Sequence, residues 1–392
     1  MVKMDRKTWA VGMTGFCAFL SLYATQPLLP LFQRAFQASK LGVSLTVSAA
    51  TLAVALVAPW SGVVADVLGR KRVIVPAVFV LGLTNLLTAS STGLASLVVW
   101  RFVQGLFTPA VFAVTVAYIS EEWPLDQVAF ATSVYVTGTV LGGFTGRFLS
   151  GLIAVDFSWR WAFVALGLLN LGLGVAVAAW MPLAKRFSRH EGYFQSARAM
   201  VGHLANRDLW AVFAVGFCIL FSLVGTFTYV TFHLAAPPYN LSTSKLGSIF
   251  FVYLIGAVIT PLVGHFGDQI KGRVTLASAL ATSAFGVLLT LASPLWVVML
   301  GITFCASGVF VCQIVTNRAV GLRSKGSRAA AVGLYVTCYY LGGFVGSVAP
   351  GLLWSWGGWP ACVALISGVL VTASLYVAIT WRDAAGLTTV AP

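Results

Sequence analysis

Long apolar runs, separated by short polar segments, dominate the sequence. Each run is 19 to 26 residues long, and a helix needs roughly 20 apolar residues to cross the hydrocarbon core of a bilayer. The pattern therefore predicts twelve transmembrane helices. Their approximate spans are 8–33, 43–66, 73–91, 94–118, 128–152, 159–182, 209–234, 246–267, 274–292, 295–317, 329–353 and 359–381.

Very little of the chain lies outside these runs. The largest polar segment covers residues 183–208, is basic and lies at the middle of the chain. We therefore expect an N-terminal six-helix half over residues 1–182, a cytoplasmic linker over 183–208 and a C-terminal six-helix half over 209–392. The first run contains polar Tyr23 and Gln26 and no small-residue cleavage site follows it, so we interpret it as a retained helix and not as a signal peptide.

A twelve-residue segment occurs twice in the chain with few changes. YVTGTVLGGFTG covers residues 135–146 and YVTCYYLGGFVG covers residues 335–346, an offset of 200 at which eight positions are identical. Gly151 recurs at the same offset as Gly351. The repeat indicates that the two halves are built alike.

Composition agrees with a membrane protein. Hydrophobic residues make up 59% of the chain, charged residues make up 9%, and the mean hydropathy is +0.92. A soluble protein of this size needs a more polar surface, and one very large apolar core is the less favoured alternative.

The lysines and arginines set the expected orientation. Eighteen of them fall in termini and loops on one side of the predicted helices, and four fall on the other side: Arg34, Lys40, Arg160 and Lys245. Because Lys and Arg gather in cytoplasmic loops, both termini are expected in the cytoplasm. Short basic loops also account for the net charge of +14, which therefore does not indicate nucleic-acid binding.

Motifs for metals, cofactors and enzyme chemistry are missing from the sequence. The six cysteines fall inside predicted helices without a CxxC spacing, and the four histidines do not cluster, which argues against a metal site and a disulfide framework. There is no phosphate-binding loop and no pair of intramembrane acids, which argues against nucleotide hydrolysis and intramembrane hydrolysis. We expect no enzyme activity and no cofactor.

The loop after the second run carries a charged motif. GVVADVLGRKRV covers residues 62–73, with Asp66 four residues before Arg70, a spacing that suits an ion pair, and with Gly69 at a tight turn. A charged loop that only anchors topology is the alternative. The spacing resembles the signature between helices 2 and 3 of the major facilitator superfamily. GHFGDQIKGRV, residues 264–274, is a degenerate second copy with one extra residue.

The resemblance covers essentially the whole chain. WRFVQG, residues 100–105, resembles the second family motif. GTVLGGFTGRFLSG from Gly138 stands in place of the glycine-rich motif of the drug:proton antiporter branch, but it lacks the usual Gly-Pro and contains Arg147. The pattern is most similar to that of bacterial arabinose-efflux-like inner-membrane exporters. It implies an all-α integral membrane fold with two pseudo-symmetric six-helix halves. It also implies gating residues, which are Gly62, Asp66, Gly69, Arg70, Arg72, Asp268 and Arg273.

Small residues at a four-residue spacing predict smooth helix faces. They are Gly138, Gly142 and Gly146 on the fifth predicted helix, and Gly342 and Gly346 on the eleventh. The family resemblance implies that the fifth helix meets the eighth, and the eleventh meets the second, across the seam between the halves. We expect these faces to let the halves rock, with Gly62 as a further point of close helix approach. Ordinary tight packing within each half is the alternative.

Two charged residues lie well inside predicted helices. Arg101 and Arg147 both fall in the outer half of the membrane, where an arginine costs roughly 2.5–3.5 kcal/mol and is functional by default. We expect a polar cluster that faces a central cavity and binds substrate: Tyr23, Gln26, Arg101, Gln104 and Arg147. The alternatives are a structural hydrogen-bonding role for Arg101, and for Arg147 an interfacial position with Asp156 as its partner.

The second half contributes aromatic and weakly polar side chains without a buried charge. Any one aromatic residue at helical spacing usually only packs, but together these side chains suit an amphiphilic solute. The substrate-binding residues expected there are Phe221, Tyr229, Tyr253, Gln313 and Tyr339.

No Asp or Glu lies in the middle of a predicted helix. The missing carboxylate favours anionic, zwitterionic or neutral substrates over cations. We therefore expect a monomeric exporter of small amphiphilic organic molecules in the bacterial inner membrane. It works by alternating access and proton antiport, with substrate, protons and the lipid bilayer as its partners. The alternatives are proton-coupled or potential-driven uptake, and a non-transporting receptor or enzyme on the same fold.

Overall fold

The computed structural model describes residues 4–184, 202, 206–255, 272–324 and 328–381, and all regular structure within these ranges is helical. The elements are α1 (Arg6–Leu20), η1 (Gln26–Leu28), α2 (Leu29–Ala35), α3 (Lys40–Leu68), α4 (Arg70–Ala89), α5 (Leu94–Glu122), α6 (Leu125–Asp156), α7 (Trp159–Trp180), α9 (Arg207–Ala235), α10 (Thr243–Ser248), η2 (Ile249–Phe251), α12 (Gly272–Leu289), α13 (Leu295–Arg323) and α14 (Arg328–Thr380). Within the described ranges, nine helices are long and apolar enough to cross a membrane. An all-α membrane protein is thus confirmed, while the count of twelve helices and the orientation of the termini stay predictions.

Most described helices begin and end within a few residues of the predicted runs. The first predicted run and the one at 246–267 depart from this, as does α14, which spans the last two runs without a loop between them. It breaks at Gly357 and Gly358, where Gly358 has a φ of +61° that favours glycine. The run predicted at 246–267 begins as α10 and η2, and its later part lies outside the described residues, as does most of the linker predicted at 183–208.

The first predicted helix is broken into two parts. α1 ends at Leu20 and η1 begins at Gln26, with a turn between them. Pro27 and Pro30 are the second residues of η1 and α2. A proline is tolerated there because the first N–H groups of a helix have no partner within it. The same prolines cannot continue α1, so backbone carbonyls in the turn are left without helical partners. Side chains from other helices donate hydrogen bonds to these carbonyls.

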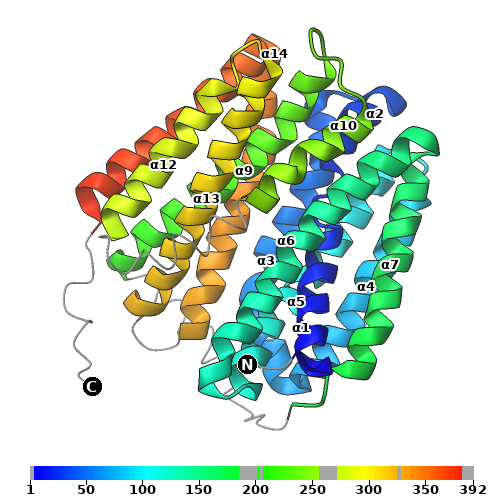
Figure 1. The fold of residues 1–392 in the computed structure, drawn as a ribbon, viewed down its shortest axis with the longest axis vertical. Helices are drawn as coiled ribbons and strands as arrows, with labels where there is room; N and C mark the ends of the chain where they lie inside the picture. The colour runs from blue at the N-terminus through cyan, green and yellow to red at the C-terminus, as the bar shows by residue number, and fades with distance from the viewer. Residues whose placement is uncertain (1–3, 185–201, 203–205, 256–271, 325–327, 382–392) are drawn as a thin grey trace.

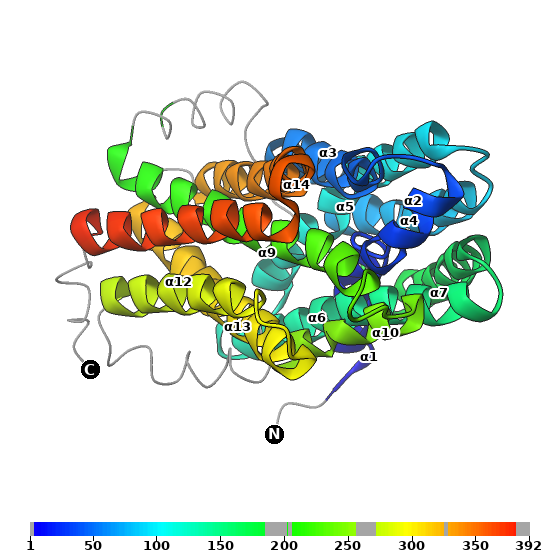
Figure 2. The ribbon, with the colours of Figure 1, turned by 90° about the horizontal axis from the view of Figure 1, so that it is seen from above.

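The helices form two bundles that stand side by side, as Figures 1 and 2 show from two directions. One bundle holds α1–α7, and the other holds α9, α12, α13 and α14. The most extensive packing between the bundles is that of α3 along α14 and of α10, from the second half, against α6. These are the second–eleventh and fifth–eighth helix pairs implied by the family resemblance.

The repeated glycines do not lie on this seam, so that expectation was wrong. An added Cβ at Gly142 would overlap the backbone of Phe16 in α1, and one at Gly342 would overlap the backbone of Phe217 in α9. Gly138 and Gly146 contact α1, and Gly346 contacts α9, in the same way. The repeated segment therefore recurs because the fifth helix of each half packs backbone to backbone against the first helix of that half. This is the alternative given above, tight packing within each half.

Other small residues make the close approaches across the seam. An added Cβ at Gly151 in α6 would lie 2.9 Å from the Cα of Gly247 in α10. One at Gly333 in α14 would lie 3.3 Å from the Cα of Pro59 in α3. At the end opposite the N-terminus, the Nζ of Lys40 also lies 4.9 Å from the ring centroid of Trp354. Close approach across the seam therefore occurs at Gly151 and Gly333 and not at the repeated glycines, and rocking along the seam stays a prediction.

Candidate substrate-binding site

Arg147 lies in the interior between the two bundles. Its Nε–H donates to Oε1 of Gln26 at 2.8 Å, and its Nη1 donates to the Gly143 carbonyl at 2.6 Å. Gln26 follows the break in the first helix, and its Nε2 in turn donates to the hydroxyl of Thr228 in α9 at 3.3 Å. The break thus places the Gln26 side chain within hydrogen-bonding distance of both Arg147 in α6 and Thr228 in the second bundle.

Three aromatic rings surround the Arg147 guanidinium. The ring centroids of Tyr23, Phe250 and Tyr253 lie 4.7, 4.9 and 4.8 Å from its Cζ. Tyr23 comes from the first half, whereas Phe250 and Tyr253 come from the second. Such contacts stabilise a cation through the negative faces of the rings. Because they carry no charge, the guanidinium keeps its full positive charge in this apolar enclosure.

Arg147 also keeps unused hydrogen-bonding capacity. A guanidinium has five N–H groups, and two are bonded, so three have no acceptor among the described residues. The two ion pairs given below involve other residues, and no described Asp or Glu, Asp156 included, pairs with Arg147. The side chain is 3% exposed. A buried cation without a carboxylate is costly unless a ligand provides the anion.

Arg101 has a different environment. Tyr23 lies near both arginines, but the hydrogen bonds of the five residues expected to form one cluster divide into two separate networks. Its Nε donates to the Thr46 carbonyl at 3.1 Å, and its Nη1 donates to the Ser21 carbonyl at 2.8 Å. It also bonds the Leu22 carbonyl and the side chain of Gln104. Arg101 therefore donates to two carbonyls in the turn that follows α1, where the Ser21 carbonyl also accepts from the Ala24 N–H at 3.2 Å and where a cation suits the helix dipole. This is the structural role stated as the alternative.

Gln104 belongs to the Arg101 network and not to the Arg147 site. Its Nε2 donates to Oδ1 of Asn85 at 3.1 Å, and Nδ2 of Asn85 donates to the Ser21 hydroxyl at 2.6 Å. All of these side chains are buried. The network ties α4 and α5 to the break in the first helix and leaves no cavity-facing group among its hydrogen-bonded atoms.

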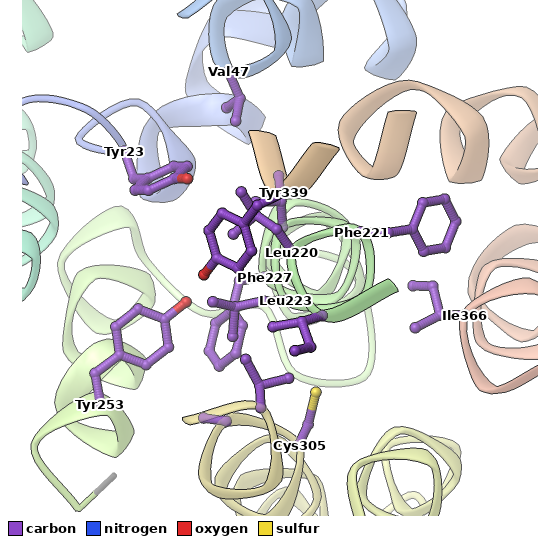
Figure 3. Packing of buried hydrophobic residues seen from close by; sticks show 14 of the residues in the cluster. Tyr23, Val47, Leu220, Phe221, Leu223, Phe227, Tyr253, Cys305, Tyr339 and Ile366 are labelled. Carbon is purple, nitrogen blue, oxygen red and sulfur yellow. The ribbon is translucent and has the colours of Figure 1, made fainter. Parts of the chain in front are cut away.

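The residues expected from the second half separate into two groups. Tyr253 covers Arg147, and Figure 3 shows Tyr253, Tyr339 and Tyr23 on the same side of α9. In the same view Phe221 points to the other side of α9, toward Ile366. The Phe221 ring stacks on that of Phe217 with centroids 6.1 Å apart, so it packs inside its own half, and its expected substrate role finds no support from this position.

Tyr229 and Gln313 do not contact Arg147 either. The hydroxyl of Tyr229 donates to the Ser347 carbonyl at 2.7 Å and lies 3.2 Å from the Ser44 hydroxyl. It therefore joins α9, α14 and α3 at the seam, and its expected role as a ligand stays a prediction. Gln313 in α13 is half-buried, and its side chain has no hydrogen-bond partner among the described residues.

The charged motif after α3 forms an ion-paired turn. Nη2 of Arg70 lies 2.6 Å from Asp66 and 2.6 Å from Glu121, and its Nε donates to Glu121 at 3.1 Å. Its Nη1 donates to the Gly62 carbonyl at 3.3 Å. Gly69 has a φ of +92° and ends α3. The predicted Asp66–Arg70 pair is thus present, and Glu121 is an additional partner.

The other described residues predicted to act in gating make fewer contacts than Arg70 does. An added Cβ at Gly62 would meet no described atom within 4 Å, so the close approach expected there is not seen among the described residues. Arg72 is exposed. Arg273 bonds the carbonyl of Ala378. Asp268 lies outside the described residues.

Two large cavities open at the end opposite the N-terminus. Their volumes are about 680 and 620 Å³, and both are lined by Gln33 and Lys40 near the turn between α2 and α3. Neither is lined by Arg147. One of them reaches Thr243 and Leu246, which neighbour the Gly247 contact with α6. The helix pair α6–α10 therefore separates this cavity from the Arg147 site.

Sequence reasoning missed several residues of these networks. Thr228 and Asn85 are small polar residues in apolar helices, and their types and spacing do not distinguish them from many others. Glu121 lies three residues beyond the helix predicted at 94–118 and within α5, which is longer than predicted.

The sequence matches the family model described as Major Facilitator Superfamily over residues 11–257 and 234–391. It is 32% identical over 377 residues to the inner membrane transport protein YnfM of Escherichia coli (strain K12), covering 94% of this chain and 89% of that protein. It is 29% identical over 367 residues to the uncharacterized MFS-type transporter YybF of Bacillus subtilis (strain 168), covering 93% and 91%.

The fold is also similar to that of a solved transporter. The nucleoside transporter NupG superposes with a TM-score of 0.78 at 13% identity, covering 96% of this chain and 100% of that one. At this identity the likeness shows the fold alone. The narrower resemblance to the drug:proton antiporter branch and to arabinose-efflux-like exporters stays a prediction. Because the family model and the relatives match nearly the whole chain, the chain belongs to the major facilitator superfamily, whose members are membrane transporters and not enzymes.

Proposed function

We propose that this protein is a secondary active exporter of small amphiphilic organic molecules with an anionic, zwitterionic or polar neutral end. Its place is the bacterial inner membrane, in line with the bacterial relatives. The observation that carries the proposal is Arg147, a buried guanidinium with three N–H groups free of described acceptors and no carboxylate partner. A substrate anion completes this site, and the surrounding rings accept its apolar body.

Alternating access follows from where the site lies. Arg147, Gln26 and Tyr23 belong to the first bundle, whereas Thr228, Phe250 and Tyr253 belong to the second. Separation of the bundles at one end therefore opens the site to that side, and closure buries it again. Asp66 and Arg70 are proposed, from the family resemblance, to latch the cytoplasmic end of the first bundle against the second. In the structure, the ion pairs of Arg70 with Asp66 and Glu121 join α3, α4 and α5 within the first bundle.

The proposed driving force uses the membrane potential and protons. An anion leaving a negative interior gains about 2.3 kcal/mol per charge per 100 mV. Proton antiport follows from the family resemblance, with Asp66 or a proton carried by the substrate as the exchanged group. Asp66 is the acid of the proposed latch and is about one third exposed.

Proton flux in everted membrane vesicles tests this proposal. A pH-quenched dye reports proton release while matched organic anions and cations are added. We expect release with anions or zwitterions, loss of that signal in Arg147→Gln, and an unchanged signal in Arg34→Gln, which removes an exposed arginine.

The same assay separates the alternatives. Release with lipophilic cations and an unaffected Arg147→Gln variant would contradict the anion site. Accumulation of a labelled anion in right-side-out vesicles, with no accumulation in everted ones, would instead identify an uptake transporter.

A further inference from the structure

Both ends of the Gln26 side-chain amide are bonded in the site. Because the Nε–H of Arg147 can only donate, the Gln26 oxygen must face it at 2.8 Å. The amide nitrogen then faces the Thr228 hydroxyl at 3.3 Å, which can accept. The orientation of the amide is thus fixed by its two partners. Gln26 is 1% exposed, so no water competes for these bonds from outside.

A carboxylate at this position would fit the same space. Glutamate and glutamine have nearly the same shape, and a glutamate oxygen would lie in the Gln26 oxygen's place beside the guanidinium. It would form a buried ion pair and cancel the Arg147 charge. The Thr228 hydroxyl could still bond it, because a hydroxyl donates as well as accepts. The neutral amide therefore holds Arg147 by the same geometry without neutralising it.

Arg70, in the same chain, is held by carboxylates and not by a neutral amide. Its guanidinium is paired with Asp66 and Glu121, so its charge is matched by carboxylates of the protein. It belongs to a turn whose role is to hold helices together. Arg147 is paired with an amide and three aromatic rings, none of which carries charge. The difference between the two arginines is the identity of the side chains that accept from them.

We infer that Gln26 sets the charge selectivity of the Arg147 site: it positions the guanidinium while leaving its charge available for a substrate carboxylate or similar anion. This inference rests on the proposed function and deepens it. Gln26 also links substrate binding to closure, because it bonds Arg147 of the first bundle and Thr228 of the second at once. Only the arrangement with the two bundles together permits both bonds.

Four proteins separate charge from geometry. The wild type has a site charge of +1 from Arg147, Gln26→Glu and Arg147→Gln each bring it to zero, and the double variant Gln26→Glu/Arg147→Gln brings it to −1. The control is Gln33→Glu, which makes the same chemical change in α2 at a half-buried position away from Arg147. Size-exclusion chromatography of each purified protein confirms that it is folded.

Binding is measured by calorimetry with probe pairs that share one ring system and differ in charge, naphthoate against naphthylmethylammonium and their benzene counterparts. We expect the wild type and Gln33→Glu to prefer the carboxylates. Gln26→Glu should weaken carboxylate binding roughly 30-fold or more, because its carboxylate competes for the same guanidinium. The double variant should prefer the ammonium probes, a reversal that a purely structural role for Gln26 would not produce.

The outcomes distinguish this inference from the proposed function. If the wild type prefers carboxylates and Gln26→Glu retains that preference, the role of Gln26 is refuted while the anion site stands. The same holds if the folded double variant does not turn toward ammonium probes. If the wild type shows no preference for carboxylates, the proposed function fails first, and the role of Gln26 fails with it.

Discussion

Arg101 and Arg147 are both buried arginines in apolar helices, yet their hydrogen-bonding states are opposite. Arg101 donates to the carbonyls of Ser21, Leu22 and Thr46 and to the side chain of Gln104. Arg147 donates to two acceptors only and has aromatic rings around the rest of its guanidinium. The two lie on different sides of the break in the first helix.

The contrast between these two arginines shows how a structural arginine can be distinguished from a ligand-binding one. Arg101 uses four of its five N–H groups in bonds to the protein and has little capacity left for a ligand, so it stabilises the fold. An arginine held by few acceptors retains donors and charge, and the protein bears the cost of burying it until a ligand binds. The test for a ligand-binding arginine is thus its remaining donors and not its depth in the membrane.

Arg101→Gln should have the largest effect on the fold. The shorter, neutral side chain cannot make the bonds of Arg101 to three carbonyls and to Gln104, and breaking a buried hydrogen-bond network is destabilising. We expect a loss of roughly 2–5 kcal/mol in the free energy of unfolding, seen as a lower Tm and a smaller monodisperse fraction after detergent extraction. Arg101→Lys should also be destabilised, because an ammonium lacks the planar spread of donors. A normal Tm in Arg101→Gln would remove the distinction between the two arginines.

Arg147→Gln should abolish anion binding without harming the fold. The substituted amide can still donate to Gln26, and the uncompensated charge is gone, so the Tm should stay the same or rise. We expect at least a roughly 30-fold weaker Kd for organic anions, measured by calorimetry. A strongly lowered Tm would mean that Arg147 is structural, as Arg101 is.

Asn85→Leu tests the network of Arg101 separately. It removes the partner of the Ser21 hydroxyl and of the Gln104 amide, at a cost of about 1–2 kcal/mol in the free energy of unfolding. The Kd for anions should stay within about twofold, because none of these groups faces Arg147. A much weaker Kd would show that the two networks act as one.

Tyr253 should show the smallest effect. Its ring contacts the Arg147 guanidinium and its hydroxyl has no described hydrogen-bond partner. Tyr253→Leu should weaken anion binding about 3- to 10-fold through loss of the aromatic contact, whereas Tyr253→Phe should bind as the wild type does. Equal losses in both variants would assign the role to the hydroxyl and not to the ring.

The sequence could predict the features that depend on local chemistry. Apolar run length gave the helices because a bilayer fixes the length that a helix needs. The Asp66–Arg70 pair followed from a four-residue spacing on one helical face, and the turn at Gly69 from a glycine between two helices. The family resemblance added which helices meet across the seam.

The sequence could not tell which face of a helix meets which neighbour. The glycines at 138, 142 and 146 share a face, but their spacing does not say whether that face points to α1 or to α10. Phe221 and Tyr253 are both aromatic residues in helices of the second half, and only the rotation of α9 turns Phe221 away from Arg147. Helix rotation results from the packing of all neighbours together.

The amino-acid sequence by itself determined that this chain crosses a membrane, that its two halves repeat, and that two arginines are buried in it, because these follow from hydropathy and from residue identity. Only the tertiary structure decided that Arg101 stabilises a broken helix while Arg147 stays available beside Gln26. That choice depends on which carbonyls and carboxylates lie within about 3 Å of each guanidinium. Those groups come from segments far apart in the chain, such as residues 21–26, 46 and 143, and folding alone brings them there.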